Sequence, residues 1–130
     1  VRGLARFADA RALFAGSLVC AAATAAAIRR RRPDEVVFVV TGEWVDRDGD
    51  EDLACADYLD ALLHGESPDP APFARRVRES DFGRRFLAGD NPNLPRSDLD
   101  LCAQADRFDF AMPARRDDGR CVLVAERLPA

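Results

Sequence analysis

The pattern of hydrophobic and polar positions divides the chain into alternating extended and helical segments. Residues 18–32 are rich in alanine, the strongest helix former, and close with four arginines, which a helix C-terminus favours. Pro33 prevents that helix from continuing. Residues 36–40 form an unbroken run of valine and phenylalanine, typical of a parallel strand covered on both faces. A shorter apolar run at residues 12–15 precedes the helix, so the pattern predicts a βαβ unit with two parallel neighbouring strands.

The next strong helix is expected from about Glu51 to His64. Asp48 is its expected N-cap, in a capping box that Glu51 closes. Its apolar stripe is expected to comprise Leu53, Ala56, Leu59, Leu62 and Leu63.

Weaker signals complete the outline of the chain. Further helices are expected at residues 2–10, at 73–79 with a short helical turn through 87, and in a segment that Ser97 caps. Strands are expected at 108–112 and 120–125, with a turn over 113–119 between them.

These elements predict an α/β fold: a layered α/β/α arrangement with a largely parallel or mixed sheet. Residues 1–130 are expected to form a single domain. The chain opens in mid-pattern at Val1 and lacks an initiator methionine, so we expect it to be a fragment.

Composition narrows the class of protein. The net charge of −4 argues against binding of nucleic acid through bulk positive charge, and no apolar stretch is long enough to span a bilayer. The four cysteines are far apart and form no CxxC pair, which favours reduced thiols over disulfides or zinc. We therefore expect a soluble, cytoplasmic protein.

Two positions in the chain could carry chemistry. Glu51 and Asp52 are adjacent carboxylates at a helix start, where they could hold Mg²⁺ or simply stabilise the helix. Ser17 follows a strand and opens a helix, where its hydroxyl could bind an anion or serve as an ordinary N-cap. The residues alone leave both pairs of alternatives open.

The order of several short motifs is more specific than any one of them. They are Gly16-Ser17-Leu18-Val19-Cys20-Ala21, a strand end at Gly42-Glu43, Glu51-Asp52-x-x-Cys55-Ala56, Ser80-x-x-Gly83, Asp98-x-x-x-Cys102, and Asp106-x-Phe108-Asp109 followed by Pro113. This series, which runs over essentially the whole chain, resembles the ComB family of 2-phosphosulfolactate phosphatases.

The chain departs from the family pattern at three positions. Cys20 stands where the family has asparagine, Phe82 where it has histidine, and Asp57 where it has glycine. The family is also nearly twice as long. The resemblance therefore implies that an N-terminal half precedes Val1 and that this chain is the C-terminal portion of a larger domain. We expect the 130 residues alone not to turn over phosphate monoesters at an enzymatic rate.

The resemblance implies a phosphoric monoester hydrolase that uses Mg²⁺ to convert 2-phosphosulfolactate into sulfolactate and phosphate, on the route to coenzyme M. We expect Glu51 and Asp52 to hold the metal. The candidate catalytic residues are Glu51, Asp52 and Ser80, and the candidate substrate-binding residues are Ser17, Gly42, Glu43 and Arg84. The expected substrate is a small phosphorylated organic acid. The expected protein partner is either a second copy of this chain or the N-terminal half of the enzyme. We expect binding to neither nucleic acid nor a membrane.

A second class of function remains open from the same residues. The substitutions at Cys20 and Phe82 favour a non-catalytic ComB-like remnant that acts as a binding or oligomerisation module. Retention of Glu51 and Asp52 opposes that interpretation.

Overall fold

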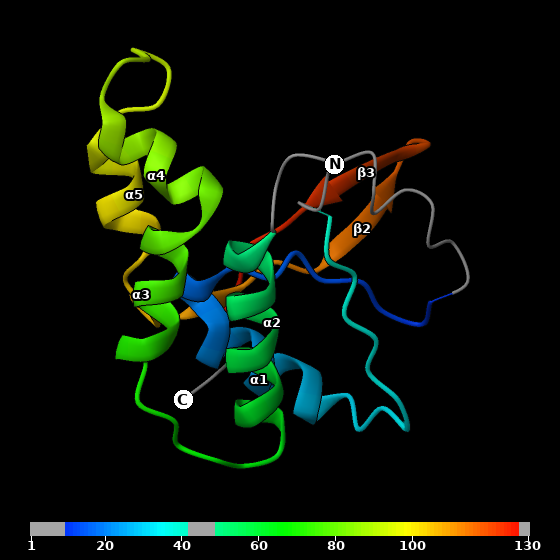
Figure 1. Ribbon diagram of the computed structural model, residues 1–130. Coiled ribbons are helices and arrows are strands. Elements are labelled where there is room, and N and C mark those ends of the chain that lie inside the picture. The colour runs from blue at the N-terminus through cyan, green and yellow to red at the C-terminus, as the bar shows by residue number, and fades with distance from the viewer. Residues whose placement is uncertain (1–9, 42–48, 128–130) are drawn as a thin grey trace.

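The computed structural model describes residues 10–41 and 49–127. Within these ranges it consists of five α-helices, a short 3-10 turn and two small two-stranded antiparallel sheets (Figure 1). The chain is therefore a mixed α/β protein in which helices predominate. The helix expected at residues 2–10 falls mostly outside the described residues.

The alanine-rich helix forms as predicted. A 3-10 turn, η2 (Leu18–Cys20), leads into α1 (Ala21–Arg30). The helix ends among the arginines, and Arg32 adopts a left-handed conformation with a φ of 46° just before Pro33. The cations and the proline thus end the helix where the sequence indicated.

The other four helices are also present, at α2 (Asp50–Leu63), α3 (Ala71–Glu79), α4 (Asp81–Ala88) and α5 (Arg96–Cys102). The sequence predicts the positions of these helices more accurately than their N-cap residues. The N-cap of α2 is Gly49, not Asp48, and that of α5 is Pro95, not Ser97. Gly49 has a φ of 61°, a conformation that glycine adopts at little cost, so the backbone rather than a side chain sets the start of α2.

The buried face of α2 differs from the predicted stripe. Ala54, Tyr58 and Leu59 are buried, whereas Leu53 is 41% exposed. Ala54 of α2 belongs to the same core cluster as Ala21 and Ala25 of α1. Because these side chains are small, the two helix backbones can approach closely. The core cluster comprises Leu18, Ala21, Ala25, Ala54, Tyr58, Leu59, Val77, Leu99 and Ala103.

The sheets contradict the predicted topology. Strand β1 (Phe110–Ala111) pairs antiparallel with β4 (Glu126–Arg127), and β2 (Ala114–Asp117) pairs antiparallel with β3 (Arg120–Leu123). The segment expected to be only a turn, 113–119, therefore contains a strand. The β2–β3 hairpin extends from the helices in Figure 1.

The expected parallel βαβ unit is wrong for the described residues. Phe14 forms an antiparallel bridge with Pro113, supported by hydrogen bonds from Ala15 N to Met112 O at 3.0 Å and from Ala114 N to Leu13 O at 2.8 Å. Residues 36–40 form no strand pair there. An unbroken apolar run indicates that a segment suits burial on both faces, but it does not identify a partner strand. The layered, largely parallel sheet is thus absent from the described part of the chain.

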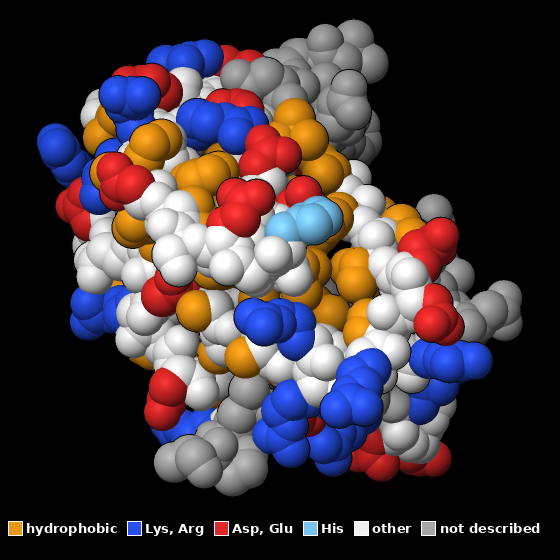
Figure 2. Space-filling model, turned by 90° about the horizontal axis from the view of Figure 1, so that it is seen from below, with side chains coloured by type: hydrophobic (Ala, Val, Ile, Leu, Met, Phe, Trp, Pro, Cys, Tyr) orange, Lys and Arg blue, Asp and Glu red, His pale blue; other side chains and the backbone are white. Residues whose placement is uncertain are grey.

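Arg31 joins the end of α1 to the C-terminal strands. Its Nη2 lies 3.0 Å from both carboxylate oxygens of Glu126, and its guanidinium lies 4.9 Å from the centre of the Phe14 ring. One side chain thereby connects α1, residues 12–15 and β4. Figure 2 shows one face of the molecule, where hydrophobic side chains reach solvent between groups of acidic and basic ones.

Asp106 joins the start of α1 to α2. Its Oδ1 accepts a hydrogen bond from Ala22 N at 2.6 Å, and its Oδ2 accepts one from the Tyr58 hydroxyl at 2.7 Å. Its own N–H donates to Leu18 O at 3.0 Å. Because the first turn of α1 has no side-chain cap of its own, Asp106 satisfies a helix N–H from 84 residues away.

We predict that Asp106→Ala lowers the free energy of unfolding by about 1–2 kcal/mol, because an α1 N–H and the Tyr58 hydroxyl lose their acceptor. Urea unfolding measures this difference. Asp109→Ala is the matched control, since it removes a carboxylate that forms only an exposed pair with Arg127 and is expected to leave stability unchanged. Equal effects of the two substitutions would contradict the capping role.

Candidate functional site

The first turn of α2 carries three consecutive carboxylates, on Asp50, Glu51 and Asp52. Gly49 is buried, and its carbonyl accepts from Asp52 N and Leu53 N, which fixes the start of the helix. The helix dipole favours negative charge at this end. Helix stability alone would therefore explain why acidic residues occur there. Only the contacts of each carboxylate can distinguish a metal-binding site from simple stabilisation of the helix N-terminus.

Asp50 is held in an ion pair between helices. Arg76 Nη2 lies 2.6 Å from Asp50 Oδ1, and Arg76 Nη1 lies 2.6 Å from Asp57 Oδ2. The two carboxylates raise the pKa of Arg76 above its usual value. Asp50 thus ties α2 to α3 and holds the first turn of α2 in place.

The carboxylate of Asp52 faces the end of the 36–41 segment. Its Oδ2 accepts a long hydrogen bond, 3.4 Å, from Thr41 N. This contact brings the residue just before Gly42 to the first turn of α2. Gly42 and Glu43 themselves lie outside the described residues.

Glu51 is the unusual member of the three. Its Oε2 is buried and has no hydrogen-bond partner among the described residues. A buried, unpaired carboxylate oxygen costs free energy, and in native structures such an atom commonly indicates an ion or a water molecule. Asp52, the next residue in the same turn, carries a second carboxylate.

Two carboxylates are a suitable protein ligand set for Mg²⁺, but too few to enclose a metal ion completely. Mg²⁺ is usually held by one or two carboxylates, with water and substrate phosphate completing its octahedron. In residues 10–41 and 49–127 no group of three or more histidine, cysteine or acidic side chains could hold a metal ion. A Mg²⁺ ion held by these two residues would take its remaining ligands from water or substrate.

Two buried thiols adjoin the first turns of α1 and α2. Burial raises the pKa of Cys20, and burial together with the charge of Asp52 raises the pKa of Cys55 to about 12. Both cysteines are free and protonated at neutral pH, so neither is an activated nucleophile. At position 20 the resembled family has asparagine. This chain has a buried thiol there in place of the asparagine amide.

Ser17 does not lie at the carboxylates. Its neighbour Gly16 contacts the middle of α2, where an added Cβ would lie 3.2 Å from Leu59 Cδ1. Leu59 is eight residues beyond Glu51, which corresponds to about 12 Å along a helix. The Ser17 hydroxyl makes no hydrogen bond among the described residues, and its carbonyl accepts from Cys20 N at 3.2 Å. It remains a candidate anion ligand, on a different part of α2 from Glu51.

The geometry of Ser80 is that of a structural cap. The residue is 1% exposed, and its hydroxyl donates to Val77 O and accepts from Gly83 N, both at 3.0 Å. A Cβ on Gly83 would lie 2.3 Å from Val77 O, so this glycine is needed for the close turn between α3 and α4. The Ser80-x-x-Gly83 motif is thus explained by packing, and no exposed hydroxyl supports a catalytic role.

Arg84 and Phe82 also make local contacts. Arg84 donates to the carbonyl of Glu79 and to the carboxylate of Asp81, within its own helix and the preceding turn. The Phe82 ring meets Phe86 edge-to-face at 5.3 Å between centres. The substrate-binding role of Arg84 stays a prediction that these contacts do not favour.

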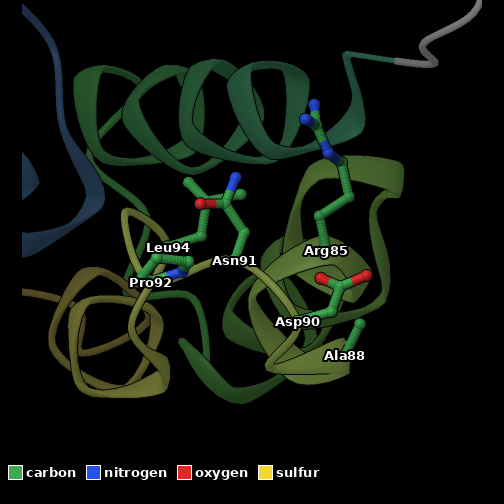
Figure 3. A pocket seen from close by; sticks show the side chains of 6 residues that line it. All are labelled: Arg85, Ala88, Asp90, Asn91, Pro92 and Leu94. Atoms are coloured by element: carbon green, nitrogen blue, oxygen red, sulfur yellow. The ribbon is translucent and has the colours of Figure 1, made fainter.

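A surface hollow of about 360 Å³ lies at the end of α4 and the loop after it, a place that sequence reasoning did not single out. It is lined by Arg85, Ala88, Asp90, Asn91, Pro92 and Leu94. Figure 3 shows Arg85 and Asn91 extending in the same direction. The Gly-Asp-Asn-Pro run at residues 89–92 was the available signal, since it predicts a loop rich in polar groups.

In the part of the chain that the structure describes, no helix is both long enough and apolar enough to cross a membrane. Comparisons of the chain with protein-family models, with curated proteins and with solved structures found no match in any of the three. The carboxylates at the start of α2, with the unpaired oxygen of Glu51 as their distinguishing feature, are therefore the main guide to function.

Proposed function

We propose that the chain holds the metal of a Mg²⁺-dependent phosphatase, and that the substrate is 2-phosphosulfolactate, as the resemblance to the ComB family implies. The observation that supports the proposal is the buried Oε2 of Glu51, which has no hydrogen-bond partner among the described residues and belongs to the residue that precedes Asp52 in the first turn of α2. Capping alone does not account for that atom, because a helix N-terminus attracts carboxylates that remain solvated.

The chain's own residues would do the following work. Glu51 and Asp52 would hold the cation, and the hydrogen bond from Thr41 would orient Asp52. The ion pair between Asp50 and Arg76 would keep the first turn of α2 rigid. When bound, Mg²⁺ would neutralise charge on the phosphate and orient the attacking water. The proposal keeps the substrate-binding residues that the sequence suggests, which are Ser17, Gly42, Glu43 and Arg84.

A second candidate function is a non-catalytic ComB-like remnant that serves as a binding or oligomerisation module. Specific contacts favour it. Ser80 caps a helix, Arg84 is engaged by Asp81 and Glu79, and Phe82 packs on Phe86 where the family has histidine. In this alternative the carboxylates of α2 would only stabilise the helix.

We predict that Mg²⁺ stabilises the protein through Glu51 and Asp52. At a concentration 100 times the dissociation constant, a ligand that binds only the folded state adds about 2.7 kcal/mol, and the melting temperature should rise accordingly. The double variant Glu51→Gln, Asp52→Asn keeps the shape and removes the charge, so Mg²⁺ should no longer raise its melting temperature.

Differential scanning calorimetry with and without Mg²⁺ measures this effect. Asp60→Asn is the matched control, because it removes one exposed carboxylate from the same helix and should keep the full response. Without Mg²⁺, the double variant should differ from the natural protein by no more than about 1 kcal/mol. An identical Mg²⁺ response in the double variant would restrict these residues to capping.

We also predict a loss of phosphatase activity when the same two substitutions are made in the complete enzyme, which includes the N-terminal half that the resemblance implies. The rate of phosphate release from 2-phosphosulfolactate should fall at least about a hundredfold, the size expected when charge in the transition state loses several kcal/mol of support. High Mg²⁺ should restore part of the rate, because the defect lies partly in metal affinity. Absence of turnover in a complete protein that binds Mg²⁺ would favour the remnant over the phosphatase.

A further inference from the structure

Residues 36–40 show the exposure pattern of a strand but pair with no strand among the described residues. Val37 is 70% exposed and Val39 is 51% exposed, whereas Phe38 between them packs against the core cluster. This alternation is that of a β-strand with one face on the core. In Figure 1 the segment, drawn in cyan, runs as an extended trace beside the helices.

The backbone of this segment is unpaired as well. Among the described residues, no backbone hydrogen bond involves residues 36–40, and the contact of Thr41 with Asp52 comes only after the segment. Five consecutive apolar residues whose N–H and C=O groups make no backbone hydrogen bond to the described residues form an edge that readily pairs with another strand.

The sequence of the segment specifies a symmetric partner. Val-Val-Phe-Val-Val is a palindrome centred on Phe38. In an antiparallel pair related by a two-fold axis, Phe38 would face Phe38 of the second copy and Val37 would face Val39. Aromatic and β-branched residues that face each other across strands are favourable pairs.

The charges that flank the segment fit the same arrangement. Arg29, Arg30 and Arg32 precede it, are exposed, and form no ion pair within the described residues. The preceding side keeps a net positive charge even with Asp34 and Glu35 included. The following side, residues 41–52, has a net negative charge. An antiparallel pair places the positive end of each strand beside the negative end of the other, whereas a parallel pair would place like charges together.

We infer that residues 36–40 pair antiparallel with the same segment of a second copy, and that the protein is a symmetric dimer joined through this edge. The inference is independent of the proposed phosphatase, since it rests on the backbone, symmetry and charges of this segment. The two new strands would form a central two-stranded ribbon with Phe38 at its centre.

The test is sedimentation equilibrium of the 130-residue protein over about a hundredfold range of concentration. We expect a dimer of twice the 14.3 kDa chain mass at the high end. The double variant Val37→Lys, Val39→Lys places like charges opposite each other across the pair, and its dissociation constant should rise at least about tenfold. Both side chains are more than half exposed, so the melting temperature of the monomer should change little.

Two further proteins sharpen the result. Leu87→Lys with Leu101→Lys is the matched control, because both leucines are 40% exposed on other elements and should leave the dimer intact. Mixing the Val37→Lys, Val39→Lys chain with a Val37→Glu, Val39→Glu chain should give a heterodimer, since each lysine would then face a glutamate. A monomer at every concentration would overturn the inference, as would a dimer that both charge variants retain.

Hydrogen exchange supplies a readout that needs no variant. The amides of residues 36–40 should be protected in concentrated solution and exchange faster on dilution. Protection that does not depend on concentration would mean that another part of the same chain covers the edge, and would overturn the inference.

Discussion

The close contact between α1 and α2 is the constraint on which the rest of the structure depends. Alanines at their interface let the two backbones approach, and Tyr58 adds the one large polar contact, to Asp106. Because that carboxylate also caps α1, a single residue near the C-terminus fixes the register of both helices. Helix α3 packs against α2, α4 against α3, and α5 against α4. The ion pair between Arg76 and Asp50 orients the acidic first turn of α2.

The helices were predictable from the sequence because the signals that define them are local. Alanine content, the arginines before Pro33 and the apolar period of residues 50–63 each lie within a few turns. The sheets were not, because their pairing is decided by distant residues: Phe14 meets Pro113, and no composition rule connects them. One local signal was available, since Asp118-Gly119 favours the two-residue hairpin in which both residues have positive φ, 45° and 73°.

The candidate site divides in the same way. Adjacent carboxylates at the start of a helix could be seen in the sequence, whereas the contact of Asp52 with Thr41 could not, because it depends on how residues 36–41 pack beside α2. The unpaired oxygen of Glu51 could not, because burial of one atom depends on side chains from several elements. Ser80 was assigned chemistry on a motif whose spacing, serine to glycine at three residues, also describes a helix cap. Spacing alone does not distinguish these roles, whereas hydrogen-bond partners do.

The central claim is that Glu51 and Asp52 form an open site for a divalent cation. Its most direct test is a crystal of the protein grown with Mn²⁺, which replaces Mg²⁺ and can be located by anomalous scattering. The account predicts an anomalous peak bonded to a carboxylate oxygen of Glu51 and near the carboxylate of Asp52, with water at the remaining positions. A map without that peak, in which Glu51 Oε2 is hydrogen-bonded to an ordered water or to the protein, would contradict it.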